Sequence, residues 1–172
     1  MSDLSPPPPP PPVLPTPPPG EQVQATIPGI MRTAGFLGVN SRLHTLVITN
    51  QRLIFARLTG AELKRVVKGL SEGAKAEGKD WKGRMRERAG AYQALADECA
   101  AMNPDDLLAQ HPKNFAVDRA TITKVRLRTV DRSEAGPEDR LTITTTGKKY
   151  KLVLTVTSLK RTAKILAKAR LL

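Results

Sequence analysis

The stretch from Leu43 to Leu58, LHTLVITNQRLIFARL, most narrows the folds open to this chain. It holds two apolar runs rich in β-branched residues, separated by the polar turn Thr49-Asn50-Gln51-Arg52. Such runs are typical of strands, and asparagine tolerates the left-handed backbone that a tight hairpin turn needs. The stretch therefore predicts a β-hairpin. Its centre is apolar on both faces of the pleat, so we expect one face to meet another sheet and the other to be partly covered by helices.

The N-terminus differs in composition from the rest of the chain. Of the 15 prolines, 11 lie between Pro6 and Pro19. Each proline ring fixes φ and removes a backbone donor, so residues 1–20 are predicted to form a disordered polyproline tail. Two interpretations remain open for the tail: a ligand for an aromatic-lined groove of another domain, or a spacer, which the lack of flanking basic residues favours. The globular domain is expected to span residues 21–172.

A kinked strand and a loop are predicted before the hairpin. In residues 24–33, QATIPGIMRT, short apolar positions are broken by Pro28 and Gly29. Proline cannot donate to a central strand ladder, so this segment predicts an edge strand. Residues 34–42 carry the glycines and polar residues of a loop. The loop's apolar pair Phe36-Leu37 has two interpretations: a plug at the end of the sheet, which we favour, or a contact with a membrane or partner.

Helical periodicity follows the hairpin. Apolar residues recur at helical spacing across residues 61–110, which predicts two helices, or one helix broken near Gly78. Asn103 and Pro104 then have the chemistry of a helix cap and first turn, so a short helix is expected from Pro104 to about Gln110.

The last third predicts three strands and a terminal helix. Residues 120–130 alternate apolar and basic positions, residues 131–139 are expected to form a loop, and residues 141–146 and 149–154 predict a second hairpin. Ser158 is a candidate cap for an amphipathic helix that runs to the C-terminus, with its lysines opposite an apolar stripe.

The formal net charge of +12 is concentrated in the same third. Residues 111–172 hold 15 basic and 5 acidic residues. The outward positions of the predicted strands form a basic face if these strands share one sheet: Lys124, Arg126, Arg128, Lys148, Lys149 and Lys151. Two interpretations of this face are weighed equally: it neutralises an anionic ligand, or its charges only solvate the sheet and discourage aggregation.

No pattern indicates catalysis. The only histidines and the only cysteine, His44, His111 and Cys99, are too few and too far apart to predict a zinc site. No phosphate-binding glycine loop or hydrolase motif is present. We therefore expect no enzyme activity, no cofactor and no metal. The single cysteine and the lack of a signal-like apolar run predict a cytoplasmic location, with peripheral membrane association as an option.

The order of elements resembles the PH-like fold, a strongly bent β-sandwich or partly open barrel with a helix at one end. The segment LVITNQRLIFARL is similar to prokaryotic PH-like and GRAM-related domains, in which a strand, a T-N/D-x-R turn and an apolar strand recur. Residues 103–128 resemble a later part of such domains, where Ile122 and Val125 mark a bulged strand. The resemblance implies an α+β, PH-like domain over residues 21–172, with residues 61–110 as a helical insertion.

Members of the wider PH-like superfamily bind phosphoinositides, peptides or other domains, so the resemblance implies a recognition module. We expect a non-enzymatic binding or adaptor module whose basic face meets an anionic membrane surface or a protein partner. The alternative is a sequence-independent nucleic-acid-binding protein, which the sequence pI near 10.3 favours. The basic strands lack the interleaved aromatic residues on which bases stack, which argues against it. A structural scaffold is the third option.

Overall fold

The computed structural model describes residues 20–33, 41–75, 81–132 and 136–172. In these ranges the strands are β1 (Val23–Arg32), β2 (Arg42–Thr49), β3 (Arg52–Arg57), β4 (Phe115–Asp118), β5 (Ile122–Arg132), β6 (Gly136–Thr145) and β7 (Lys149–Leu154). The helices are α1 (Gly60–Lys75), α2 (Trp81–Ala101), α3 (Pro104–Ala109) and α4 (Leu159–Lys168). The polyproline tail up to Pro19, the pair Phe36-Leu37 and the break near Gly78 lie outside the described residues.

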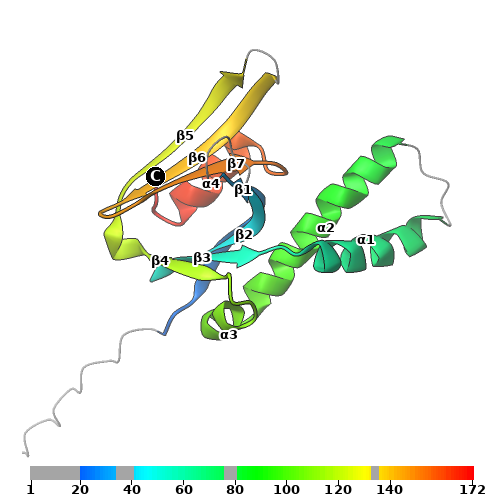
Figure 1. The fold of residues 1–172 in the computed structure, drawn as a ribbon, viewed down its shortest axis with the longest axis horizontal. Coiled ribbons are helices and arrows are strands. Elements are labelled where there is room, and N and C mark those ends of the chain that lie inside the picture. Colours follow the sequence, from blue (N-terminus) through cyan, green and yellow to red (C-terminus); the bar gives the residue numbers. More distant parts are fainter. Residues whose placement is uncertain (1–19, 34–40, 76–80, 133–135) are drawn as a thin grey trace, which may run out of the picture.

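All the strands belong to one antiparallel sheet with the order β4-β3-β2-β1-β7-β6-β5 (Figure 1). In the described residues β4 and β5 do not pair with each other, so the sheet is not closed. The helices α1 to α3 come between β3 and β4, and α4 follows β7. The chain therefore has an α+β fold with a C-terminal helix.

The predicted central hairpin is confirmed as β2 and β3, which pair from His44 opposite Arg57 to Ile48 opposite Leu53. Its turn is held by the Thr49 hydroxyl, which accepts hydrogen bonds from the backbone N–H groups of Gln51 and Arg52 at 3.1 and 2.9 Å. These bonds satisfy turn donors that the strand ladder leaves without partners.

The prediction that the first strand lies at an edge was wrong, because β1 pairs with β2 on one side and β7 on the other. The proline is accommodated by a register shift between Ile27 and Ile30, which removes Pro28 from the regular ladder. Gly29 has a positive φ of 58°. Its carbonyl accepts a hydrogen bond from the Thr155 backbone N–H at 3.1 Å, which ties the bulge to the end of β7.

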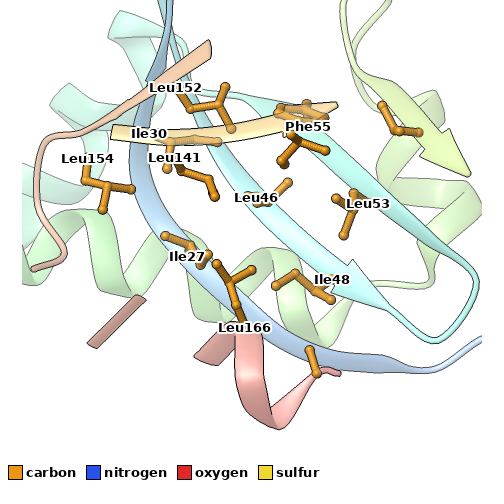
Figure 2. Packing of buried hydrophobic residues seen from close by; sticks show 13 residues of the cluster. Ile27, Ile30, Leu46, Ile48, Leu53, Phe55, Leu141, Leu152, Leu154 and Leu166 are labelled. Atoms are coloured by element: carbon orange, nitrogen blue, oxygen red, sulfur yellow. The ribbon is translucent and has the colours of Figure 1, made fainter. Parts of the chain in front are cut away.

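The main core lies on the inner face of the curled sheet (Figure 2). Leu46 and Phe55 from the central hairpin pack in one cluster with Leu141 of β6, Leu152 of β7 and Leu166 of α4. The curl is visible in the contact between Phe55 and Tyr150, whose ring centroids are 5.6 Å apart although β2 and β1 separate their strands in the sheet. The layer that meets the hairpin is thus the other half of its own sheet together with α4, and not a second sheet.

A second cluster covers the opposite, outer face of the hairpin. Val47, Ile54 and Ala56 are buried there against Leu107 of α3, with Cys99 at the edge of the cluster. The expectation that helices cover this face is confirmed. The predicted short helix also begins as expected, because the Asn103 side chain accepts a hydrogen bond from the Asp105 backbone N–H at 2.9 Å.

Three boundaries differ from the sequence prediction. The strand β4 was not predicted, and the arms of the β5–β6 hairpin run through most of the expected loop at residues 131–139. Ser158 does cap α4, but this helix stops at Lys168. Arg170 has φ of 56°, outside the helical region, and Leu172 is 55% exposed and so leaves the predicted apolar stripe.

Candidate anion-binding surface

Five of the six basic residues that the sequence predicts as contacts lie on the outer face of β5, β6 and β7. Strand pairing places Lys124 opposite Thr144 and Thr144 opposite Lys149. Arg126, Thr142 and Lys151 make a second row in the same way. Directly opposite residues in an antiparallel sheet project from the same face. We call this surface the basic strand face; its basic residues are Lys124, Arg126, Arg128, Lys149 and Lys151.

The register of these strands keeps the charges in water. The alternate positions Leu141, Ile143 and Leu152 are buried in the inner core. Because side chains alternate between faces, a slip of one residue would bury the cations and expose the core. The packing of apolar residues on the inner face is therefore the physical reason why the basic residues gather on the outer face.

The spacing of the basic strand face suits an extended anionic surface. Neighbouring strands lie about 4.8 Å apart, so Lys124 and Lys149 are separated by about 10 Å, while residues two apart along a strand are about 7 Å apart. These separations are close to the Debye length of about 8 Å at physiological ionic strength. All five side chains are exposed. Among the described residues none of them forms an ion pair with a carboxylate.

The sixth predicted residue, Lys148, takes a different position. It lies in the turn between β6 and β7, and its ammonium is 5.5 Å from the centre of the Tyr150 ring. Tyr150 packs against the inner core, as the alternation predicted. Lys148 therefore leans away from the basic strand face, toward the inner side of the sheet.

The basic strand face has two boundaries on the outer side of the sheet. At one end Arg140, opposite Arg128, is half-buried and paired with Glu138, so its charge is locally neutralised. On the side of β2 and β3 the outer face is covered by α2 and α3. Figure 1 shows these helices next to β2 and β3 and apart from β5 and β6. The helices thus cover one half of the outer face and leave the basic half open.

The arginine of the T-N-x-R turn has a structural role. Arg52 donates a bidentate hydrogen bond to the Glu21 carboxylate, at 2.9 Å from Nε and 2.7 Å from Nη2, and also pairs with Asp105. Beside it, the Asn50 side chain accepts a hydrogen bond from the Gln22 backbone N–H at 2.8 Å. The turn therefore anchors the start of β1 to the hairpin and to α3.

A second group of cations was not singled out from the sequence. Arg32 ends β1, Arg42 begins β2 and Arg57 ends β3, and we call these three residues the rim arginines. Arg32 is directly opposite Arg42, and Arg57 is directly opposite the buried His44. Extending the inward alternation of each strand by one step, from Ile30 or Phe55 to the strand end, would have found them.

One of the rim arginines, Arg32, lies against a set of stacked aromatic rings. Phe55 and Phe115 stack at 4.6 Å, and Tyr150 stacks on Phe55 at 5.6 Å. The guanidinium of Arg32 lies 5.0 Å from the centre of the Phe115 ring, a cation–π distance. At this end of the inner face the aromatic rings are therefore stacked face to face, with one guanidinium, that of Arg32, over the Phe115 ring.

The pKa of His44 depends on its burial and on the arginines at this end of the sheet. Burial, followed by the charges of Arg32 and Arg57, lowers the pKa of His44 below its usual 6.5. A hydrogen bond of 3.0 Å between Nδ1 and the carbonyl of Arg42 opposes this shift without reversing it. Because a carbonyl only accepts, Nδ1 carries the proton, and His44 is neutral at pH 7.

The next candidate for chemistry is the Cys99 thiol. Burial, assisted by the charges of Glu62 and Glu98, raises the pKa of the Cys99 thiol to about 11. A thiol with so high a pKa is a poor nucleophile at neutral pH. In the described part of the chain no three His, Cys, Asp or Glu side chains are grouped so that they could hold a metal ion.

No family model matches the chain, and comparisons with curated proteins and with solved structures returned no match. Among the described helices, none has the length and apolar character needed to cross a membrane.

Proposed function

We propose that this chain is a non-enzymatic, PH-like binding module whose basic strand face engages an anionic membrane surface. The observation that carries the proposal is the set of five exposed, unpaired cations on one face of the described sheet. Attraction to an anionic lipid surface contributes about 1 kcal/mol for each basic residue near it. Five such residues on a sheet surface supply several kcal/mol without a pocket.

The PH-like part of the proposal draws support from the strand order and the terminal helix. A curled antiparallel sheet with α4 packed on its inner face agrees with a bent, partly open barrel that has a helix at one end. In such an arrangement the apolar stripe of α4 is used by the core, because Leu166 of this helix and Ala169 directly after it are buried. Membrane insertion of α4 would compete with folding, so the proposed contact is made by charges at the lipid headgroups.

Binding to nucleic acid is the second candidate, and the overall charge of +12 favours it. Proteins that bind single strands without sequence preference commonly stack bases on exposed aromatic rings. Here Phe55, Phe115 and Tyr150 stack on each other on the inner side of the sheet, and the rows of the basic strand face contain threonine between the cations. This arrangement supports binding to a membrane more than binding to nucleic acid.

Charge reversal on β5 tests the proposal. In the variant Lys124→Glu, Arg126→Glu and Arg128→Glu, retention on vesicles containing phosphatidylserine should fall by a factor of about 100 or more, from the loss of about 1 kcal/mol per cation. The full chain is sedimented with these vesicles, with neutral phosphatidylcholine vesicles and with a random DNA duplex, each at low and at physiological salt.

A matched control separates local charge from net charge. Lys160, Lys164 and Lys168 are exposed on α4, which packs on the inner side of the sheet. Their reversal to glutamate changes the net charge by the same amount and should leave most of the vesicle binding in place. Equal losses in both variants, or full binding by the β5 variant, would refute the role of the basic strand face. Retention by the duplex alone would favour the nucleic-acid function.

A further inference from the structure

The imidazole ring of His44 is buried on the inner face of the sheet and takes no part in the proposed function. The residue is only 3% exposed. Its ring meets those of Phe55 and Phe115 edge to face, with centroids 6.3 and 6.2 Å away. Nδ1 donates a hydrogen bond of 3.0 Å to the Arg42 carbonyl. This position therefore suits a neutral ring, with aromatic neighbours and one satisfied donor.

Positive charges approach His44 from two neighbouring strands. Arg57 of β3 is directly opposite His44, which places their Cβ atoms about 5 Å apart. The charges of Arg57 and of Arg32 of β1 both disfavour a further positive charge on the ring. Tyr150 of β7, which belongs to the same group of rings, carries another cation, Lys148, over its face. Among the described residues no carboxylate is one of the groups that act on His44.

A proton taken up by His44 would therefore create an unpaired charge in a dry, positively charged environment. Desolvation and like charges both disfavour the protonated form, so the pKa of folded His44 lies below its usual 6.5. In the unfolded chain the ring is an ordinary histidine. The stability contributed by the neutral ring is thus complete above pH 6.5, falls as the pH drops below 6.5, and stops falling below the folded pKa.

The start of β4 is the element that can yield to this charge. The strands β2 and β3 pair on both sides, whereas β4 is an edge strand of four residues that pairs only with β3. Its first residue, Phe115, is half-buried and provides one of the two rings against His44. Edge segments with few contacts open at a lower free energy than the core. Release of Phe115 would therefore admit water to the His44 ring at the lowest cost.

We propose that His44 is a proton-sensitive latch: when it is protonated in mild acid, the start of β4 leaves β3 and the Phe115 ring moves away from the imidazole. At neutral pH the uncharged ring keeps the latch closed. Asn114, next to Phe115, accepts a hydrogen bond from the Arg57 backbone N–H at 2.8 Å and donates one to the Leu107 carbonyl at 2.7 Å. Opening would therefore also loosen the junction between the sheet and α3.

Hydrogen exchange followed by NMR tests the latch in the full chain. Between pH 7.5 and 5.5, after correction for the intrinsic exchange rate, protection of the β4 amides should fall by up to about tenfold for each pH unit below 6.5. Sensitivity to urea scales with the surface that an opening exposes. The β4 amides should therefore respond little to dilute urea, whereas a core amide such as that of Leu46 should respond strongly. Unchanged β4 protection at pH 5.5, or equal urea sensitivity of both, would overturn the local opening.

The two histidines of the chain supply a variant and its matched control. Asparagine at position 44 can still donate to the Arg42 carbonyl but cannot ionise. In His44→Asn the β4 protection at the two pH values should agree within about twofold, because the linked proton is gone. His111→Asn should keep the full pH dependence. Dependence that persists in His44→Asn, or disappears in His111→Asn, would contradict the latch.

A second measurement decides the matter if His44→Asn does not fold. The ring protons of His44 are followed by NMR in the unchanged chain as the pH is lowered from 8 to 5. A midpoint below 6.5, accompanied by a shift of the Phe115 ring signals, supports the latch. A midpoint at or above 6.5, or titration of His44 without any change at Phe115, would refute it. The basic strand face lies on β5 to β7, so none of these outcomes bears on the proposed function.

Discussion

At the scale of single residues, Gly29 shows how a bulge makes a central strand from a sequence that contains proline. Its φ is 58°, and a Cβ built there would lie 2.5 Å from Cγ2 of Val156. Both the backbone conformation of residue 29 and the close approach of Val156 require glycine at this position. The Thr155 backbone N–H donates a hydrogen bond to the Gly29 carbonyl. Strain caused by a side chain at position 29 would therefore extend to the end of β7.

Gly29→Ala should therefore lower the free energy of unfolding by roughly 2–4 kcal/mol, from the cost of a left-handed alanine and from overpacking against Val156. Urea unfolding followed by circular dichroism measures the change. Gly147→Ala is the control, because no heavy atom lies within 4 Å of a Cβ added there. If Gly29→Ala were as stable as the unchanged chain, this result would show that the bulge is absent in solution.

At the scale of elements, the sequence predicted those features that a local residue pattern determines. The hairpin of β2 and β3, the Asn103 cap and the Ser158 cap all depend on residues within a few positions of each other. The central place of β1 depends on a bulge and on pairing with β7, more than a hundred residues away, which the rule for proline in strands does not anticipate. The strand β4 is only four residues long, FAVD, too short for a clear alternation.

Some residues of the candidate site were likewise predictable from local pattern, and others depend on distant parts of the chain. Alternation along β5 and β7 was enough to predict that Lys124 and Lys151 point outward, since one face of each strand is apolar. The placement of Arg32 and Arg57 at the same end of the inner face follows from the register of three strands, two of them separated by residues 34–40 in the chain. Lys148 was assigned to the wrong side because a turn residue does not follow the alternation of the strand after it.

The helical layer on the outer face can be tested through the thiol of Cys99. Cys99 lies in α2, and its pKa of about 11 follows from burial where this helix packs on the outer face of the sheet and from the charges of Glu62 and Glu98. At pH 8 the thiolate fraction is then about 100-fold or more below that of a free cysteine with a pKa of about 8.5, and alkylation by iodoacetamide should slow by a similar factor. Mass spectrometry follows the reaction, and urea should restore the normal rate. A native rate equal to that of free cysteine would mean that α2 separates from the sheet.

At the scale of the whole molecule, the network around Arg52 joins three parts of the chain. Glu21 precedes β1, Arg52 begins β3 and Asp105 lies in α3. Both Glu21 and Arg52 are half-buried, with side-chain exposures of 14% and 25%. A charged, hydrogen-bonded pair that is shielded from water contributes more than a surface pair, and its loss costs about 2 kcal/mol. The same contacts connect the sheet to the layer of helices.

This network makes stability depend on pH in a defined direction. Burial raises the pKa of Glu21, but the hydrogen bonds from Arg52 and Thr49 and the charge of Arg52 outweigh it, so the pKa lies below 4.5. A carboxyl whose folded pKa is depressed stabilises the fold above its unfolded pKa, and this stability is lost as pH falls through the folded pKa.

Glu21→Gln should therefore lower the free energy of unfolding by about 2 kcal/mol at pH 7, and the difference should shrink as the pH falls below 4.5. Glu98→Gln, which breaks an exposed pair with Arg65, should cost about 0.5 kcal/mol or less throughout. Urea unfolding at a series of pH values gives both differences, and a Glu21→Gln effect that stays constant from pH 7 to acid would show that the charge of Glu21 does not hold these three parts together.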